Sequence, residues 1–232
     1  MLVLGIDTSG KSGGITLAQG DDQSFRVLET DAIAGGTFSA QLVPTLAALL
    51  TRHSFSVQDI GGFAVASGPG SFTGLRVGLS AVKGLAEALG KPIAAVSILE
   101  ALATLSPQPG CVAVALDAGR KEVFWGSYEV SVEGAMRVSE ELLSQAEFLE
   151  RLSNGNLQNV ITSDPSLVAI ADATHAKARL QLINREGSEL VARVGLRKLL
   201  AGDTVSVEAL DANYIRRSDA ELFGLGSVKG NR

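Results

Sequence analysis

Short apolar runs alternate with stretches of helical periodicity along most of this 232-residue chain. Residues 2–8 and 60–66 have the continuous apolar composition of buried strands. Residues 73–89 follow the second strand with a helical pattern that stops at Gly90, with Pro92 just beyond it. Strands that alternate with helices are typical of proteins in which helices cover both faces of a mixed sheet. The chain is therefore predicted to be an α/β protein.

The length suits two lobes of roughly 100 residues each. The clearest linker is the Ser-Pro-Gln-Pro-Gly segment at residues 106–110. We therefore expect a first lobe at residues 1–106, a smaller second lobe at residues 107–223 and a frayed tail at residues 224–232. Helices are predicted in the first lobe from Thr37 and in the second at residues 142–152, 167–171 and 186–200, and the third strand is predicted at residues 25–30.

A faint internal repeat also favours two similar lobes. Residues 2–7 are echoed by residues 112–117: each is an apolar strand that ends in an aspartate, Asp7 or Asp117. A turn with glycine and a basic residue follows each strand. Two such units are expected to face each other across a cleft.

The charge balance argues against a protein that grips nucleic acid alone. The chain has 20 basic and 25 acidic residues, a formal net charge of -5, and no basic stripe. Phosphate contacts need clustered Lys and Arg, so any RNA is expected to be bound through another subunit. The start of the chain lacks the basic segment of a signal peptide, and no apolar run approaches the ~20 residues that span a bilayer. A cytoplasmic protein without a membrane segment is expected.

Asp7 and Asp117 are the candidates for nucleotide binding. In actin, sugar kinases and Hsp70, an aspartate at the end of the first strand approaches the nucleotide phosphates and their metal, and paired carboxylates suit Mg²⁺. The alternative is that both aspartates cap turns. Capping is favoured because no glycine-rich adenine-binding turn is evident around residues 163–165.

Other reactive residue types are few. His53 and His175 have no metal-ligand spacing and are expected at the surface or at helix ends. Cys111 is the single cysteine and is expected to be a buried, inert thiol. No metal site is therefore expected.

A motif loop at residues 67–76, Ser-Gly-Pro-Gly-Ser-Phe-Thr-Gly-Leu-Arg, joins a predicted strand to a predicted helix. Gly68 and Gly70 let the backbone turn sharply, and Ser71 or Thr73 can cap the first helical N–H groups. Such a helix start can bind an anion, but a tight strand-to-helix turn is the simpler explanation. The other residues singled out in the loop are Pro69, Phe72, Gly74 and Arg76.

The helix predicted after this loop is apolar over about twice the ~100° arc that packing on one sheet requires. It should therefore contact something besides its own sheet. The neighbour can be the preceding helix of the same chain, or a second subunit can dock on both helices together, and the two alternatives are compatible. The residues predicted to form this interface are Leu42, Leu46, Leu49, Leu75, Gly78, Leu79 and Val82.

Several segments together resemble the TsaB (YeaZ) family. The most specific is the Gly-Pro-Gly-Ser-Phe-Thr-Gly-Leu-Arg run within residues 65–78. The resemblance is dense over residues 1–128 and sparse afterwards. The other matching segments are residues 6–9, 81–86, 97–103, 117–125 and 214–217.

The resemblance implies an actin-like (ASKHA, ribonuclease H-like) duplicated fold, with two lobes of mixed sheets flanked by helices. It implies a non-catalytic scaffold subunit that dimerises and that binds the catalytic subunit TsaD and the ATPase TsaE. Their complex places a threonylcarbamoyl group on adenosine 37 of tRNAs that read ANN codons, with a donor made by TsaC. The resemblance implies that the chain itself binds no cofactor tightly, although the complex uses ATP, and that it meets tRNA only through the complex.

Two departures from the family pattern leave other functions open. Phe38-Ser39 stands where the family often has His-Ser, and the Gly-Asp-Gly turn common in the second lobe is not evident. One alternative is an ATP-dependent small-molecule kinase or ATPase of the same fold, which would use Asp7 and Asp117. Another is a metallopeptidase, an old label for relatives of this fold, and the missing histidine pair argues against it.

Overall fold

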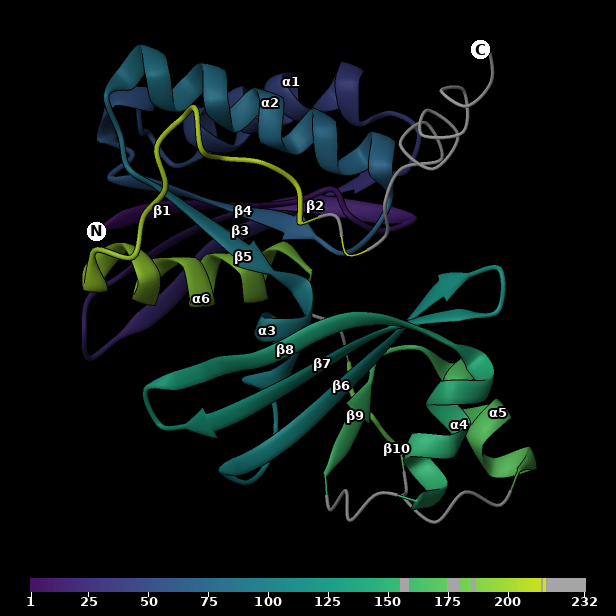
Figure 1. The fold of residues 1–232 in the computed structure, drawn as a ribbon. Coiled ribbons are helices and arrows are strands. Elements are labelled where there is room, and N and C mark those ends of the chain that lie inside the picture. Colours follow the sequence, from purple (N-terminus) through teal and green to yellow (C-terminus); the bar gives the residue numbers. More distant parts are fainter. Residues whose placement is uncertain (155–158, 175–179, 185–186, 214, 216–232) are drawn as a thin grey trace, which may run out of the picture.

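The computed structural model describes residues 1–154, 159–174, 180–184, 187–213 and 215. They form two lobes, one above the other in Figure 1, each with a five-stranded sheet. The strand order is β3-β2-β1-β4-β5 in the first sheet and β10-β9-β6-β7-β8 in the second. Taken from its other edge, the second sheet repeats the arrangement of the first in chain order. The predicted α/β fold with duplicated lobes is confirmed.

The first sheet is built around β1 (Leu2–Asp7), whose residues are all buried. β1 pairs antiparallel with β2 (Ser12–Gly20) and parallel with β4 (Gly62–Gly68). The edges are β3 (Phe25–Ala34) and β5 (Ile93–Ser97). A strand covered on both faces has a continuous apolar sequence, which is why β1 and β4 could be located from the sequence.

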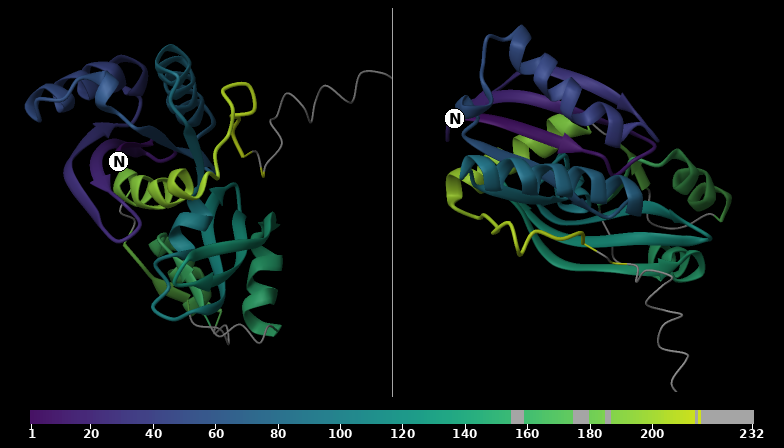
Figure 2. Two further views of the ribbon diagram at one scale, coloured as in Figure 1. Left: turned by 90° about the vertical axis from the view of Figure 1, so that its left-hand side faces the viewer. Right: turned by 90° about the horizontal axis from the view of Figure 1, so that it is seen from above.

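Helices cover both faces of the first sheet. α1 (Phe38–Arg52) and α2 (Phe72–Leu89) lie next to each other on one face, and α6 (Ser188–Ala201) lies on the other (Figures 1 and 2). α2 ends at Gly90, whose φ of 62° places it in the left-handed region that favours glycine. The short 3₁₀ helix η1 (Val57–Asp59) leads into β4.

The second sheet is centred on β6 (Gly110–Gly119). β6 pairs antiparallel with β7 (Glu122–Ser131), which pairs with the edge strand β8 (Gly134–Ser144). On its other side, β6 pairs parallel with β9 (Val160–Thr162), next to β10 (Leu180–Leu182).

The two faces of the second sheet have different neighbours. α4 (Gln145–Asn154) and α5 (Pro165–Ala173) share a small core with one face. α3 (Ile98–Ala103) packs on the other face, in a core that also contains residues of α6 and of the first sheet. The lobes are therefore joined by a common apolar core.

α6 belongs to the second half of the sequence but packs on the first sheet. Residues 203–213, which we call the C-terminal strip, continue along the first sheet. The amide of Val205 donates to the carbonyl oxygen of Ile93 at 2.9 Å. α6 and the C-terminal strip fall within the second lobe expected at residues 107–223, but they pack on the first lobe. Local periodicity cannot predict this placement, because it depends on contacts between distant parts of the sequence.

Two predicted boundaries are corrected by strand pairing. The helix expected from Leu142 begins only at Gln145, because β8 pairs with β7 as far as Ser144. β3 continues to Ala34, because it stays paired with β2. None of the helices in the described part of the chain combines the length and the hydrophobicity that a membrane span requires. The tail expected at residues 224–232 lies outside the described residues.

Candidate functional site

A cleft of about 1570 Å³ lies between the lobes. The first lobe contributes the turn after β1 and the motif loop, and the second contributes the β6–β7 turn and the start of α5. The predicted cleft is therefore present, and the motif loop forms part of its wall. Its apolar lining residues include Phe38, Leu75, Leu116, Phe124 and Ile215.

The motif loop connects β4 to α2 by a sharp turn. Gly68 has a φ of +121°, which L side chains rarely adopt. The amide of Ser71 donates to the carbonyl oxygen of Ser9 at 2.7 Å. Oγ of Ser71 accepts a hydrogen bond from the amide of Gly74 at 3.3 Å, so Ser71 is the helix cap. Thr73 lies inside the first turn of α2.

The other glycines of the motif loop permit close backbone contact. A Cβ atom on Gly70 would lie 2.3 Å from the carbonyl oxygen of Ser9. A Cβ atom on Gly74 would lie 2.1 Å from the carbonyl oxygen of Thr8. Only glycine therefore lets the loop and α2 rest directly on the turn after β1. Packing against that turn accounts for both glycines without a bound anion.

Asp7 is 1% exposed and does not line the cleft. Its Oδ1 accepts hydrogen bonds from the amide of Ser9 at 2.8 Å and from Oγ of Ser9 at 2.6 Å. This geometry corresponds to the turn-capping alternative. The carboxylate stabilises the turn on which the motif loop rests.

Asp117 occupies the equivalent place in the second lobe but is exposed and lines the cleft. Its Oδ1 accepts a hydrogen bond from the amide of Gly119 at 2.9 Å. Its own amide donates to Oδ2 of Asp164 at 2.6 Å. Asp117 also caps its turn, and the structure brings only one of the two predicted carboxylates into the cleft.

Charges of both signs line the cleft. Arg76 stacks over the ring of Phe72, with Cζ 3.8 Å from the ring centroid. Phe72 is 40% exposed, so this pair presents a cationic and aromatic surface at the start of α2. The cleft is therefore not a uniformly basic phosphate site. Its charged lining residues are Lys11, Arg76, Asp117, Arg120 and Asp164.

The seven residues predicted to form a subunit interface lie in the core of the first lobe. Leu79 is 5% exposed and Val82 is fully buried, because α1 and α2 pack against each other and against the sheet. The preceding helix of the same chain is thus a neighbour of α2. An interface on these helices must use their outward side, where Val43 is 57% exposed and a Cβ atom on Gly84 would meet nothing within 4 Å. The core residues are Leu42, Leu46, Leu49, Leu75, Gly78, Leu79 and Val82.

Cys111 is exposed, so the prediction of a buried thiol is wrong. Side chains alternate along β6, and Cys111 points away from the core beside Glu129, whose Oε1 accepts from Sγ at 2.9 Å. This hydrogen bond raises the pKa of the Cys111 thiol. His53 ends α1 as expected, with Nε2 2.7 Å from Oε2 of Glu29. His175 lies outside the described residues.

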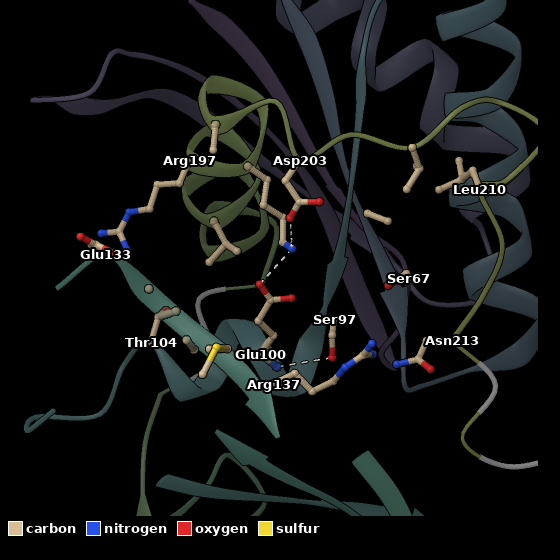
Figure 3. A pocket seen from close by; sticks show the side chains of 18 of the residues that line it. Ser67, Ser97, Glu100, Thr104, Glu133, Arg137, Arg197, Asp203, Leu210 and Asn213 are labelled. Carbon is tan, nitrogen blue, oxygen red and sulfur yellow. Dashed lines mark hydrogen bonds and ion pairs between the residues drawn. The ribbon is translucent and has the colours of Figure 1, made fainter. Parts of the chain in front are cut away.

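A second cavity, of about 710 Å³, is not predicted from the sequence (Figure 3). It lies between α3, α6, β8 and the C-terminal strip. Nζ of Lys198 is 3.1 Å from Glu100 and 2.8 Å from Asp203. Burial raises the pKa of Glu100, and the nearby Lys198 only partly opposes this. Burial lowers the pKa of Lys198, but Asp203 and Glu100 outweigh it and the net shift is upward. The lining comes from segments far apart in sequence, so no local motif marks the cavity.

Known proteins resemble the chain in both sequence and structure. A family model described as TsaD, tRNA N6-adenosine threonylcarbamoyltransferase, matches residues 32–163. The tRNA threonylcarbamoyladenosine biosynthesis protein TsaB of Bacillus subtilis is 31% identical over 99% of this chain and 100% of its own length. TsaB of Escherichia coli is 27% identical over 78% of this chain and 81% of its own length.

The fold agrees with this similarity. A solved structure named YeaZ from Pseudomonas aeruginosa is 24% identical and superposes with a TM-score of 0.71 over 92% of this chain and 100% of that one. The motif loop and the duplicated lobes thus occur together with end-to-end similarity to a TsaB protein. The chain belongs to the TsaB (YeaZ) family of tRNA threonylcarbamoyladenosine biosynthesis proteins.

Proposed function

We propose that this chain takes part in the threonylcarbamoylation of adenosine 37 in tRNAs that read ANN codons, as a non-catalytic subunit. It binds the catalytic subunit TsaD and the ATPase TsaE and forms a homodimer. It meets tRNA through this complex and holds no cofactor tightly, whereas the complex uses ATP. The observation that carries the proposal is the similarity to Bacillus subtilis TsaB over 99% of this chain and 100% of that protein.

The geometry of the cleft supports a non-catalytic role. A phosphotransferase of this fold would use the two aspartates together to hold a metal. Asp7 is instead buried in the capping of its own turn, and Asp117 caps the equivalent turn in the other lobe. The residues that carry the family motif serve to pack α2 onto the first sheet.

The outward side of α1 and α2 is the proposed partner surface. Gly84 is exposed and leaves open space, so a helix of a partner can approach the backbone of α2. Val43 adds exposed apolar area on α1. Because the residues beneath are already packed in the core, partner contacts at this site depend on these outer positions.

Reconstituted tRNA modification tests the proposal. TsaC, TsaD and TsaE are incubated with threonine, bicarbonate, ATP and unmodified tRNA, with and without this chain, and the nucleosides are measured by mass spectrometry. We expect threonylcarbamoyladenosine only when both this chain and TsaD are present. Formation of the nucleoside at the same rate without this chain would refute the required role.

A second arm separates the scaffold from an enzyme of the same fold. The chain alone is incubated with Mg-ATP, and ADP release is followed. We expect no turnover above the buffer control. Turnover that disappears in an Asp117→Asn variant would favour the ATPase or kinase alternative instead.

A further inference from the structure

Glu140 of β8 has a buried carboxylate that is held from several sides. Its side chain is 4% exposed. Oε1 accepts hydrogen bonds from Oγ of Ser97 at 2.6 Å and from the hydroxyl of Tyr128. Oε2 accepts from Nδ2 of Asn213 and lies 3.7 Å from Nη1 of Arg137. Both carboxylate oxygens therefore have donors, which offsets the cost of burying the charge.

The donors belong to different parts of the fold. Tyr128 and Arg137 lie on the second sheet with Glu140 itself. Ser97 ends β5 of the first sheet, and Asn213 ends the C-terminal strip. Burial and the charge of Glu140 raise the pKa of the Tyr128 hydroxyl, so this hydroxyl remains a donor. One carboxylate thus ties the second sheet to two segments that pack with the first.

Those two segments flank the start of the motif loop. Ser97 pairs with Gly68 across β4 and β5. The amide of Asn213 donates to the carbonyl oxygen of Ser67 at 2.7 Å. Figure 3 shows Ser67, Ser97 and Asn213 at the wall of the second cavity. The partners of Glu140 therefore hold the end of β4 from both sides, at the point where the chain turns into the cleft.

We propose that Glu140 is an interlobe latch, a positioning residue whose carboxylate sets the angle between the lobes and the placement of the motif loop. Asn213, which the carboxylate holds, lines both the second cavity and the cleft, so the latch also fixes the width of the cleft. Buried charged groups that are fully hydrogen-bonded can specify one arrangement of a structure, even where they add little stability. This role concerns the chain alone and does not depend on its partners.

The neighbouring residue supplies a matched control. Glu141 follows Glu140 on the same strand, but its side chain is 38% exposed and pairs with Arg151 at 2.7 and 2.9 Å. Both members of that ion pair belong to the second lobe. Removal of the Glu141 carboxylate therefore changes the charge of β8 without changing a contact between the lobes.

Pulsed electron resonance measures the predicted motion. Spin labels are placed at Gln41 on α1 and at Glu150 on α4, both exposed, in a Cys111→Ser background. We expect Glu140→Ala to broaden the distribution of distances between the labels and to shift its mean. Glu141→Ala is expected to leave the distribution as in the parent protein.

Hydrogen exchange gives an independent measurement. In Glu140→Ala, amides of the motif loop are expected to exchange faster by roughly tenfold to a hundredfold, the range for loss of a charge-assisted hydrogen bond. A folded Glu140→Ala variant with unchanged distances and unchanged exchange would overturn the latch. If that variant does not fold, Asn213→Ala, which removes one of the donors to Glu140, replaces it in both experiments. Smaller changes of the same kind in the label distances and in amide exchange would support the latch. No change in either measurement would reject it.

Discussion

Gly78 in α2 lies directly over Thr8 at the end of β1, so that a Cβ atom on Gly78 would be 2.5 Å from Oγ1 of Thr8. Oγ1 of Thr8 is buried and has no hydrogen-bond partner among the described residues. The two residues thus meet by close packing rather than by a polar contact. Substitutions at the two positions are expected to change stability in opposite directions.

Gly78→Ala is expected to lower the free energy of unfolding by about 1–3 kcal/mol, the usual range for overpacking. The loss occurs although alanine favours a helix interior over glycine by ~1 kcal/mol. Gly84→Ala is the matched control in the same helix. It meets open space and is expected to raise stability. Urea unfolding followed by circular dichroism measures both, and equal effects would contradict the steric account.

Thr8→Val is expected to raise the free energy of unfolding by ~1 kcal/mol, because it removes a buried hydroxyl without a partner. For a chain of this size, the melting temperature should rise by about 2–4 °C. Thr16→Val is the control, since Oγ1 of Thr16 is 2.9 Å from the hydroxyls of both Thr30 and Ser188. Thr16→Val should lower the melting temperature. If Thr8→Val lowers the melting temperature as well, Oγ1 of Thr8 has a hydrogen-bond partner in solution.

Gly84→Arg and Val43→Glu are expected to weaken the homodimer and TsaD binding at least tenfold while leaving the monomer folded. Both positions face outward, and a long or charged side chain there obstructs a close helix contact without disturbing the core. Light scattering after size exclusion and titration calorimetry with TsaD measure the two associations.

Leu79→Glu serves as the contrast for that experiment. Leu79 is 5% exposed within its own lobe, so the buried charge is expected to unfold the protein rather than to remove a partner selectively. If Gly84→Arg still forms a folded dimer and binds TsaD with unchanged affinity, the interface lies elsewhere on the protein.

Glu100→Gln is expected to change how stability depends on pH. Burial raises the folded-state pKa of Glu100 above the ordinary value of 4.5 for a glutamate. This acid therefore binds its proton more tightly in the folded state, and its contribution to stability is lost as pH rises above about 4.5. The stability of Glu100→Gln relative to the parent protein should then increase between pH 4 and pH 7. Urea midpoints across this range test the sign, and a constant difference would contradict it.

Local sequence patterns located the elements around the motif loop. The apolar runs of β1 and β4, the stop at Gly90 and the turn glycines depend on nearest neighbours, and each is confirmed. The placement of α6 on the first sheet depends on a contact across the whole chain. An apolar helix surface likewise cannot distinguish a neighbour in the same chain from a partner. Leu79 and Val82 are buried within their own lobe, so their part in a subunit interface stays a prediction.

The residues around the second cavity could not be predicted from the sequence either, because they come together only through contacts between distant segments. Glu140 stands in an acidic stretch that is typical of an exposed strand. Its burial depends on donors from Ser97 and Asn213, which no spacing along the chain connects. Cys111 differs from its prediction in the opposite direction: a neutral residue in an apolar run is predicted to face the core, but Cys111 is exposed.

The position of α6 has a consequence for synthesis on the ribosome. Val3 and Ala64 of the first sheet share a core with α6, which ends at Ala201. β5 is complete at Ser97, so about 100 further residues must be translated before that face of the sheet is covered. At ~5–20 residues per second, the nascent chain exposes an apolar sheet for roughly 5–20 s. During this interval the emerging first half is a substrate for chaperones, and a chain that stops before α6 is prone to aggregate.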